Sequence, residues 1–389
     1  MKFKFPLATT TWDNKEKEAI RRVVESNYFT MGSQVFKFEK MFANYFGAKH
    51  AVMVNSGSSA NLIMTAALFY TSNSKYRLNP GDEIIVPAVS WPTTYFPLTQ
   101  YGLKLKFVDI DIHTLNYNLA DLAAAVNKKT KALMVVNLLG NPNEFDALQK
   151  IIAGREIILI EDNCESMDAS YKQKKTGTFG LMASFSSFFS HHISTMEGGV
   201  VLTDDEELHQ ILLSLRSHGW TRNLPNKNIL TGKKSIDAFE ESFKFILPGY
   251  NLRPLEMSGA IGIEQIKKLP SITKGRRTNA KYFVKQFSNH PRYIIQSEIG
   301  KSSWFGFSLV IRPELNLERK KVLRTLKDNG FECRPIVSGN FTKHEVMKYL
   351  DYTIHSNLKN ADYIDNNGLF VGNHHYPIED AIEILFKIL

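Results

Sequence analysis

Two neighbouring histidines stand in a stretch of the chain that otherwise consists mostly of small and aromatic residues. His191 and His192 lie in segment 184–199, which is rich in serine and phenylalanine and ends in Glu197-Gly198-Gly199. An imidazole with its ordinary pKa of about 6.5 exchanges protons near neutral pH. Adjacent side chains on an extended segment point to opposite sides, and a metal site needs a third ligand at suitable spacing. The pair therefore predicts proton transfer and no metal site.

A serine-rich turn at 55–60 follows one predicted strand and opens a helix. Gly57 and Ser58 would place backbone N–H groups and a hydroxyl at the positive end of the helix dipole, which suits a phosphate. Such a turn is more often an ordinary helix cap. The residues alone leave both interpretations open.

An acidic pair, Glu161 and Asp162, follows the strand predicted at 156–160. Open α/β sheets bind ligands at the carboxyl ends of their strands. A carboxylate there either pairs with a protonated heterocycle nitrogen or caps the next helix, and both interpretations remain. The polar turn at 248–254 indicates no more than a connector by its composition.

The elements that must position these residues alternate between strand and helix. Predicted strands lie at 51–54, 83–86, 105–108, 132–136, 156–160, 183–188 and 199–202. Apolar strands separated by helices are typical of a mostly parallel sheet covered on both faces. After a long loop at 223–247, helices at 256–269, 271–287 and 317–328 and from 377 accompany strands at 293–296, 304–311 and 331–337. We therefore expect a large α/β domain at 1–265 and a small α+β domain at 266–389.

The composition excludes several classes of protein. The 389 residues carry a net charge of +9, but their lysines and arginines are scattered, which disfavours a nucleic-acid surface. The two cysteines, Cys164 and Cys333, form no CxxC pair, which excludes a disulfide scaffold and a local four-cysteine cluster. There is no run of 18 apolar residues and no apolar leader. We expect a cytoplasmic protein that binds no membrane.

In chain order, these motifs resemble the DegT/DnrJ/EryC1/StrS family of sugar aminotransferases over about residues 30–389. The resemblance rests on the turn at 55–60, Trp91, the acidic pair at 161–162, segment 184–199 and Gly249-Tyr250-Asn251 followed by Arg253. It implies an aspartate-aminotransferase-like α/β fold (fold type I of pyridoxal-phosphate enzymes) with a seven-stranded, mostly parallel sheet. It also implies a homodimer with shared active sites.

The resemblance assigns a cofactor, pyridoxal 5′-phosphate or its pyridoxamine form. Trp91 would stack on the pyridine ring, and Asp162 would pair with the protonated ring nitrogen and so maintain the ring as an electron sink. Asn251 would reach the cofactor phosphate in the partner subunit. The residues expected to hold the phosphate within the same subunit are Gly57, Ser58 and Ser186.

Two departures from the aminotransferases change the expected reaction. His191 occupies the position of their cofactor-binding lysine, and residues 176–226 contain no lysine. Glu165, three residues after Asp162, replaces their usual Gln or His in the cofactor site. His191 followed by His192-Ile193 resembles the family's 3-dehydratase branch. The cofactor would then be held non-covalently, and His191 would act as acid and base.

This branch removes the 3-hydroxyl of a nucleotide-linked 4-keto-6-deoxy sugar, and we expect GDP-4-keto-6-deoxymannose. Glutamate would regenerate the amine form of the cofactor and leave as 2-oxoglutarate, while ammonia is released. The resemblance places this lyase reaction in deoxysugar (colitose) and lipopolysaccharide O-antigen biosynthesis. An iron–sulfur partner is not expected, since the cysteines of the iron–sulfur sub-branch are missing.

Substrate contacts are predicted for six polar residues. Arg334 would bind a glutamate carboxylate with both arms of its guanidinium, unless it is an ordinary surface arginine. Ser190 would contact the cofactor or the sugar, unless its hydroxyl is solvated. The candidates for the sugar diphosphate are Arg216, His218, Arg222 and Arg253.

Two other interpretations are possible. One is an aminotransferase in which a single lysine has been changed to His191. His192-Ile193 and Glu165 argue against a single change. The other is a non-catalytic member of the family, which the retained cofactor residues disfavour.

Overall fold

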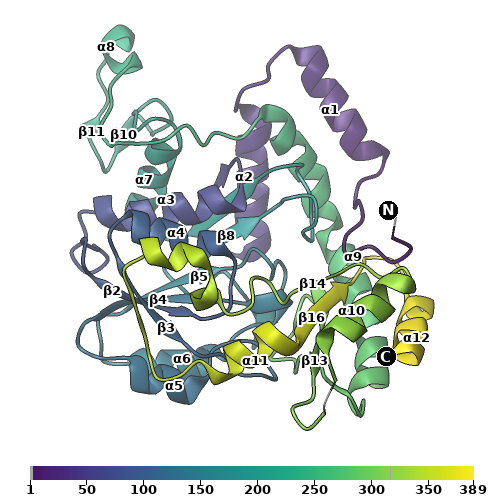
Figure 1. Cartoon of the computed structure of the whole chain (residues 1–389). Coiled ribbons are helices and arrows are strands. Elements are labelled where there is room, and N and C mark those ends of the chain that lie inside the picture. The colour runs from purple at the N-terminus through teal and green to yellow at the C-terminus, as the bar shows by residue number, and fades with distance from the viewer. Residues whose placement is uncertain (1–2, 316) are drawn as a thin grey trace.

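An eight-stranded sheet forms the centre of the larger part of the molecule (Figure 1). The computed structural model describes residues 3–315 and 317–389, so the first two residues of the predicted large domain lie outside it. The strand order is β1-β9-β8-β5-β4-β2-β3-β15. The strand bounds are β1 His50–Val54, β2 Glu83–Pro87, β3 Lys104–Val108, β4 Thr130–Val136, β5 Ile158–Asp162, β8 Met182–Ser186, β9 Gly199–Thr203 and β15 Tyr352–Ile354.

The sheet is mostly parallel, as predicted. Only β9 runs antiparallel to its neighbours, β1 and β8. The prediction of seven strands was wrong by one, because β15 pairs with the edge strand β3. Two of the three β15 residues are exposed, and its partner lies more than 240 residues earlier in the chain, so no local pattern indicates the pairing.

Alternate side chains of the strands pack against helices on opposite faces. In β4, Ala132 and Met134 join the core beneath α3, α4 and α7, whereas Leu133 and Val135 join the core beneath α5 and α6. These helices are α3 Gly57–Tyr70, α4 Pro92–Gln100, α5 Leu119–Ala125, α6 Phe145–Ile152 and α7 Glu206–Arg216. Both faces of the sheet are therefore covered, and the strand ends remain open for a site.

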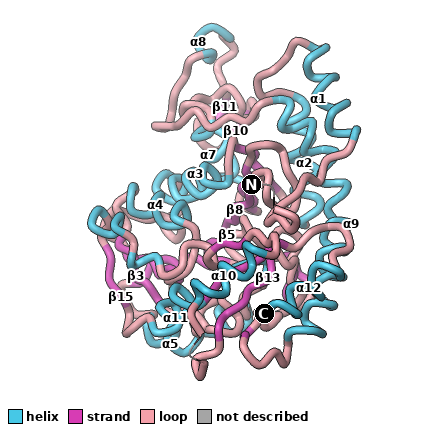
Figure 2. The backbone as a smooth tube through the Cα atoms, turned by 45° about the vertical axis from the view of Figure 1, so that its right-hand side comes forward, coloured by secondary structure: helices cyan, strands magenta, loops and turns pink. Residues whose placement is uncertain are grey.

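One long helix links the two parts of the chain. The helices predicted at 256–269 and 271–287 are a single helix, α9 Glu256–Phe287, which continues through Pro270. The predicted domain boundary after residue 265 falls within it. Figure 2 shows α9 beside α1 (Asn14–Ser26) and α2 (Ser33–Phe46), and both helices pack against it.

The C-terminal part is built around a four-stranded antiparallel sheet in the order β12-β13-β16-β14. The predicted strand at 331–337 is reduced to two residues. The bounds are β12 Tyr293–Ile294, β13 Gly306–Ile311, β14 Cys333–Arg334, β16 Gly368–Gly372, α10 Arg319–Asp328, α11 Lys359–Asn367 and α12 Glu379–Ile388. An apolar core joins this sheet to the second half of α9 and to α12.

The loop predicted at 223–247 contains short elements that extend away from the sheet (Figure 1). They are β10 Lys227–Asn228, β11 Gly232–Lys233 and α8 Ala238–Ser242. Another small hairpin, β6 Ser170–Tyr171 with β7 Lys174–Lys175, follows the acidic strand end. Among the described residues, no helix combines the length and apolar character needed to cross a membrane.

Candidate active site

A cavity of about 490 Å³ lies where the carboxyl ends of β5 and β8 meet the start of α3 and the β14 region. Its walls therefore come from both parts of the chain. Most residues predicted for the cofactor and substrate lie around it. The predicted residues that line it are Gly57, Ser58, Trp91, Asp162, Glu165, Ser186, Ser190, His191 and Arg334.

The start of α3 forms one wall of this cavity. Ser56 caps the helix through its hydroxyl, which accepts a 3.1 Å hydrogen bond from the Ser59 N–H. A Cβ atom at Gly57 would lie 2.6 Å from the Cβ of Ser186 and 3.1 Å from the Sγ of Cys164. Glycine thus allows the helix start to approach Ser186 closely. The N–H groups and hydroxyls gathered there form a cradle suited to a phosphate.

Asp162 is a buried carboxylate on the cavity wall. It accepts hydrogen bonds from Asn61 Nδ2 (2.9 Å), Thr94 Oγ1 (2.8 Å) and the Cys164 N–H (3.1 Å). Among the described residues no cationic side chain forms an ion pair with it. A buried carboxylate is costly unless it is paired. A protonated ring nitrogen in the cavity would supply the missing positive charge.

Trp91 and Glu165 flank the same space. Trp91 stands at the start of α4 with 58% of its surface exposed, so its indole face is open to a flat ligand. Glu165 Oε2 accepts a 2.9 Å hydrogen bond from the Leu139 N–H. Burial, assisted by the nearby Asp162 charge, raises the pKa of Glu165 to about 7. Its carboxyl can therefore donate or accept a hydrogen bond near neutral pH.

His191 projects into the cavity between two phenylalanines. The centre of its ring lies 5.3 Å from that of Phe305 and 6.1 Å from that of Phe188. Burial lowers the pKa of His191 to about 4, with a further contribution from the charge of Arg276. Its Nδ1 is buried, and no described group forms a hydrogen bond with it. The structure thus presents a neutral imidazole on the cavity wall, the form of the ring that is able to accept a proton.

His192 has a structural role. Its Nε2 lies 3.1 Å from the Ser303 carbonyl oxygen, and the residue is fully buried.

Within the described part of the chain, one group of three residues has potential metal-ligand atoms within 4.8 Å of one another. That trio, His50, Glu206 and His209, lines no part of the cavity.

The prediction that Arg216 contacts the sugar diphosphate was wrong. Its side chain is completely buried, forms an ion pair with Glu39 and donates a 2.7 Å hydrogen bond to the Met53 carbonyl. This placement is inconsistent with the predicted contact to a sugar diphosphate. The last turn of α7 directs the guanidinium towards α2 in the interior, away from any ligand.

The other predicted diphosphate residues gather around Trp220 and do not line the cavity. The guanidinium carbons of Arg222 and Arg253 lie 4.1 and 5.5 Å from the centre of the Trp220 ring, and the His218 ring packs at 5.2 Å. Asn251 is exposed, and its Oδ1 accepts a 3.1 Å hydrogen bond from Arg253 Nε. If these residues bind the predicted ligands, they must do so at a site other than this chain's own cavity.

Arg334 reaches the cavity from β14. Its guanidinium is more than half exposed and has Glu332 as an ion-pair partner at 2.9 Å. The other arm donates a long hydrogen bond of 3.5 Å to the Cys333 carbonyl, and the exposed edge of the guanidinium faces the open side of the cavity. Ser190 lies beside His191 at the rim.

Sequence reasoning missed Asn61, Thr94 and Phe305. Asn61 did carry a signal, since it is a polar residue directly before the apolar run Leu62-Ile63-Met64 of a predicted helix. A buried polar side chain in such a helix indicates a specific partner, which is here Asp162. Phe305 gives no local signal, because a segment more than 100 residues away places it against His191.

Residues 10–384 match the DegT/DnrJ/EryC1/StrS aminotransferase family. The chain is 61% identical to the GDP-4-keto-6-deoxy-D-mannose 3-dehydratase of Escherichia coli O55:H7 over 386 residues, 99% of each chain. A solved structure of the E. coli enzyme with bound hydrated PLP shares 59% identity, with a TM-score of 0.99 over 100% of both chains. A structure of such a dehydratase with a trapped PLP-glutamate geminal diamine shares 60% identity, with a TM-score of 0.98 over 99% of this chain and 100% of that one. This chain therefore belongs to the DegT/DnrJ/EryC1/StrS aminotransferase family and has its pyridoxal-phosphate enzyme fold.

Proposed function

We propose that this protein is a pyridoxal-phosphate-dependent 3-dehydratase that acts on GDP-4-keto-6-deoxymannose. The observation that carries the proposal is His191, a neutral imidazole that lines the cavity at the position where aminotransferases of the family carry a lysine. The high identity to named 3-dehydratases along nearly the whole chain supports the same reaction.

The residues present fit the cofactor. Gly57, Ser58 and Ser186 would hold its phosphate at the start of α3, and Asp162 would pair with its ring nitrogen. Trp91 offers a flat face for the ring. When bound, the cofactor supplies an electron sink for breaking the bond to the sugar 3-hydroxyl. An imidazole cannot bind the cofactor covalently as lysine does, so these non-covalent contacts would carry the binding.

His191 would move the proton. Its neutral ring would accept a proton from the cofactor carbon that bears the amine, and the resulting imidazolium would donate that proton to the departing 3-hydroxyl. The rings of Phe188 and Phe305 pack beside this imidazole and would reduce the access of water to it. The sugar then loses its 3-hydroxyl without gaining an amino group.

Glutamate would be the source of the amine. One sugar and one glutamate yield one 3-deoxy-4-keto sugar, one 2-oxoglutarate and one ammonia, so glutamate is oxidised as the sugar is reduced. Arg334, with its exposed guanidinium at the open side of the cavity, would bind a glutamate carboxylate. A glutamate adduct in a similar solved enzyme supports this donor.

A second copy of the chain would complete the site. The segment around α8 carries strongly exposed apolar side chains, with Ile236 94% and Phe239 88% exposed. Exposed apolar clusters mark interaction surfaces. The nearby Asn251 would contact the partner's cofactor phosphate, and the arginines on Trp220 would face the partner's sugar diphosphate.

The reaction would take place in the cytoplasm, where Cys164 and Cys333 remain reduced.

The dimer is tested by Phe239→Ser, with Tyr349→Ser as the matched control. Tyr349 is 76% exposed and lies outside the α8 segment. We expect the first variant to sediment as a monomer and to lose turnover, and the second to resemble the wild type. A Phe239→Ser variant that remains an active dimer would contradict this assembly.

The reaction is tested by its stoichiometry. The purified chain is incubated with pyridoxal phosphate, glutamate and GDP-4-keto-6-deoxymannose, and 2-oxoglutarate and ammonia are measured. We expect equal amounts of both. Formation of 2-oxoglutarate without ammonia would indicate transamination of the sugar, and the absence of both products would refute an enzymatic role.

A further inference from the structure

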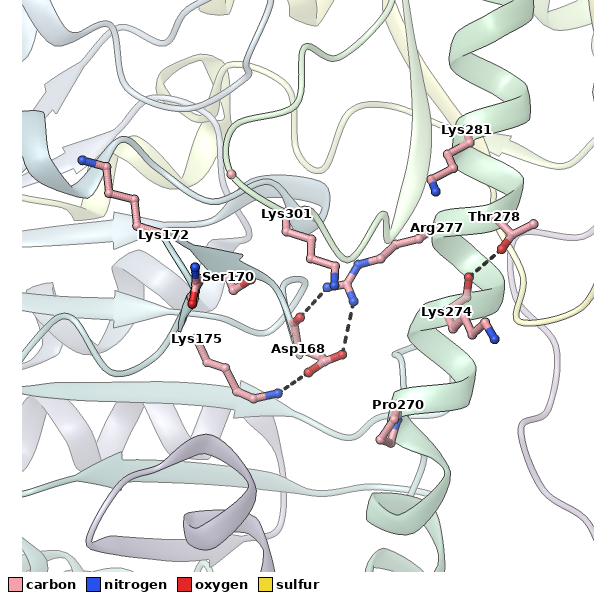
Figure 3. Close-up of a pocket in the computed structure, with 12 residues that line it drawn as sticks. Asp168, Ser170, Lys172, Lys175, Pro270, Lys274, Arg277, Thr278, Lys281 and Lys301 are labelled. Carbon is pink, nitrogen blue, oxygen red and sulfur yellow. Dashed lines mark hydrogen bonds and ion pairs between the residues drawn. The ribbon is translucent and has the colours of Figure 1, made fainter.

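A second cavity, of about 850 Å³, has cationic side chains at half of its lining positions (Figure 3). Among the described residues it shares no lining residue with the catalytic cavity. Within residues 3–315 and 317–389, Asp168 is the only carboxylate that lines it. Its six cationic side chains are Lys172, Lys175, Lys274, Arg277, Lys281 and Lys301.

Three elements hold these side chains in place. Lys274, Arg277 and Lys281 follow a spacing of three and four along α9, so they share one face of the helix. The hairpin β6–β7 forms the second wall and turns tightly at Lys172 and Gln173, both with positive φ. Such a two-residue turn matches the twist of its strands.

The third wall is the segment at Gly300 and Lys301. The Lys301 N–H donates a 2.7 Å hydrogen bond to the Ser170 carbonyl, and the Ser170 N–H donates one of 3.0 Å in return. A Cβ atom at Gly300 would lie 2.5 Å from that same carbonyl oxygen. Lys301 is therefore fixed at its backbone against β6, while its side chain is exposed.

The charges of this cavity are only partly balanced. Asp168 forms ion pairs with Lys175 and Arg277, and Lys172 pairs with Asp146 outside the cavity. Arg277 also donates hydrogen bonds to the carbonyls of Asp168 and Ser302, at 2.6 and 2.8 Å. The three remaining ammonium groups, on Lys274, Lys281 and Lys301, form no ion pair with any described residue.

We propose that this cavity binds an anion that carries two or three linked phosphate groups. Lys274 and Lys281 lie seven residues apart, about 10 Å along the helix. Together with Lys301 on the facing wall, they offer several separate ammonium groups, which favours a chain of phosphates over a single one. The hydroxyl of Ser170 lies on the same walls and can donate a further hydrogen bond, whereas Thr278 Oγ1 already donates one of 3.0 Å to the Lys274 carbonyl.

A nucleic acid fits the charge distribution less well. Elsewhere the lysines and arginines are scattered, and none of the described residues that line this cavity has an aromatic side chain on which a base would stack. A cavity whose positive charges are confined to a small region suits a compact anion. Tight binding of a long oligonucleotide, with little binding of short phosphates, would therefore overturn the proposal.

The proposal is tested by calorimetric titration of inorganic tripolyphosphate into the full chain saturated with pyridoxal phosphate. The cofactor occupies the catalytic phosphate cradle, and the paired variants separate binding in this cavity from binding at the arginines on Trp220. The test variant is Lys274→Gln with Lys281→Gln. The matched control is Lys267→Gln with Lys285→Gln, which removes the same charge from exposed positions on the same helix.

We expect the wild type and the control to bind tripolyphosphate equally, and the test variant to bind about tenfold more weakly, since it loses two charged hydrogen-bond donors. Lys301→Gln should weaken binding as well. Arg277 is left unchanged, because its hydrogen bonds to two carbonyls hold the cavity together. No binding by the wild type, or an equal loss in both double variants, would overturn the proposal.

Five further measurements test the same proposal. Tripolyphosphate should raise the melting temperature of the wild type and the control more than that of the test variant. Its affinity should fall as salt is added, and orthophosphate should bind more weakly. Adenosine triphosphate distinguishes the sources of the anion, because tighter binding than tripolyphosphate indicates a nucleotide and equal binding indicates recognition of the phosphates alone. Dehydratase turnover should stay unchanged in the test variant.

Discussion

The side-chain amide of Asn61 donates a 2.9 Å hydrogen bond to the Asp162 carboxylate. The orientation of the Asn61 amide is fixed, because Ser184 Oγ donates a 2.6 Å hydrogen bond to its oxygen. Thr94 donates a second hydrogen bond to the same carboxylate oxygen. This chain of contacts positions Asp162 at the cavity wall before any ligand arrives.

Replacing Asn61 with Leu tests this arrangement. The variant leaves Asp162 without one of its donors and free to turn, so we expect pyridoxal phosphate to bind about tenfold more weakly, in line with the loss of a hydrogen bond to a charged group. Titration followed by cofactor absorbance measures the affinity. An unchanged affinity in a variant that melts like the wild type would show that Asn61 does not position Asp162.

The His191→Asn variant separates proton transfer from binding. Asparagine can occupy the same space but cannot accept a proton, so kcat should fall by about 10²–10⁴-fold. Because the cofactor contacts lie elsewhere, its dissociation constant should change little. A variant with normal kcat and a raised KM would assign His191 to substrate binding instead.

The protonation of Glu165 in the cavity affects the free energy of unfolding. Its pKa is raised from 4.5 to about 7 in the folded protein, so between these values the folded state binds more protons than the unfolded state. The stability of the cofactor-free protein therefore falls as pH rises through this range. Glu165→Gln removes the burial of this charge and should raise the free energy of unfolding at pH 8 by roughly 1–2 kcal/mol.

Urea unfolding at pH 5 and pH 8 measures this effect. The wild type and the variant should differ little at pH 5 and clearly at pH 8. A variant that is less stable than the wild type at pH 8 would show that the Glu165 carboxylate forms a favourable contact. In the loaded enzyme, the same substitution should lower turnover, since Glu165 faces the cofactor site.

Arg216 is expected to act through stability alone. Arg216→Met leaves the buried Glu39 unpaired, which should destabilise the protein by about 3–5 kcal/mol. Replacing Glu39 with Gln in the same chain should recover part of the loss. Denaturant unfolding measures both variants. Normal stability combined with a raised KM for the sugar nucleotide would instead restore the predicted role in diphosphate binding.

The strands and the local motifs were predictable because each depends on neighbouring residues. Apolar runs such as 132–136 predict buried strands, and the turn at 55–60 predicts the start of α3, as the structure confirms. Asp162 lies at a strand end, where parallel sheets place ligands. The predicted cofactor residues of one subunit therefore meet in one cavity.

The features that the sequence did not predict depend on contacts between segments that are distant in the chain. Arg216 has the same sequence context whether it turns outward or towards Glu39, and only the packing of α7 against α2 decides between these. Likewise, β15 extends the sheet through pairing with β3. The union of two predicted helices into α9 shows that Pro270 is tolerated within a helix packed on several sides. None of these outcomes has a periodic signal in the sequence.

Mass analysis of the sugar product tests the central claim most directly. The chain is incubated with pyridoxal phosphate, glutamate and GDP-4-keto-6-deoxymannose, and the sugar is analysed alongside a His191→Lys control. We predict a 3-deoxy-4-keto sugar from the wild type, with one oxygen fewer than the substrate and no added nitrogen. A sugar that keeps its 3-hydroxyl and carries an amino group at position 4 would contradict the account.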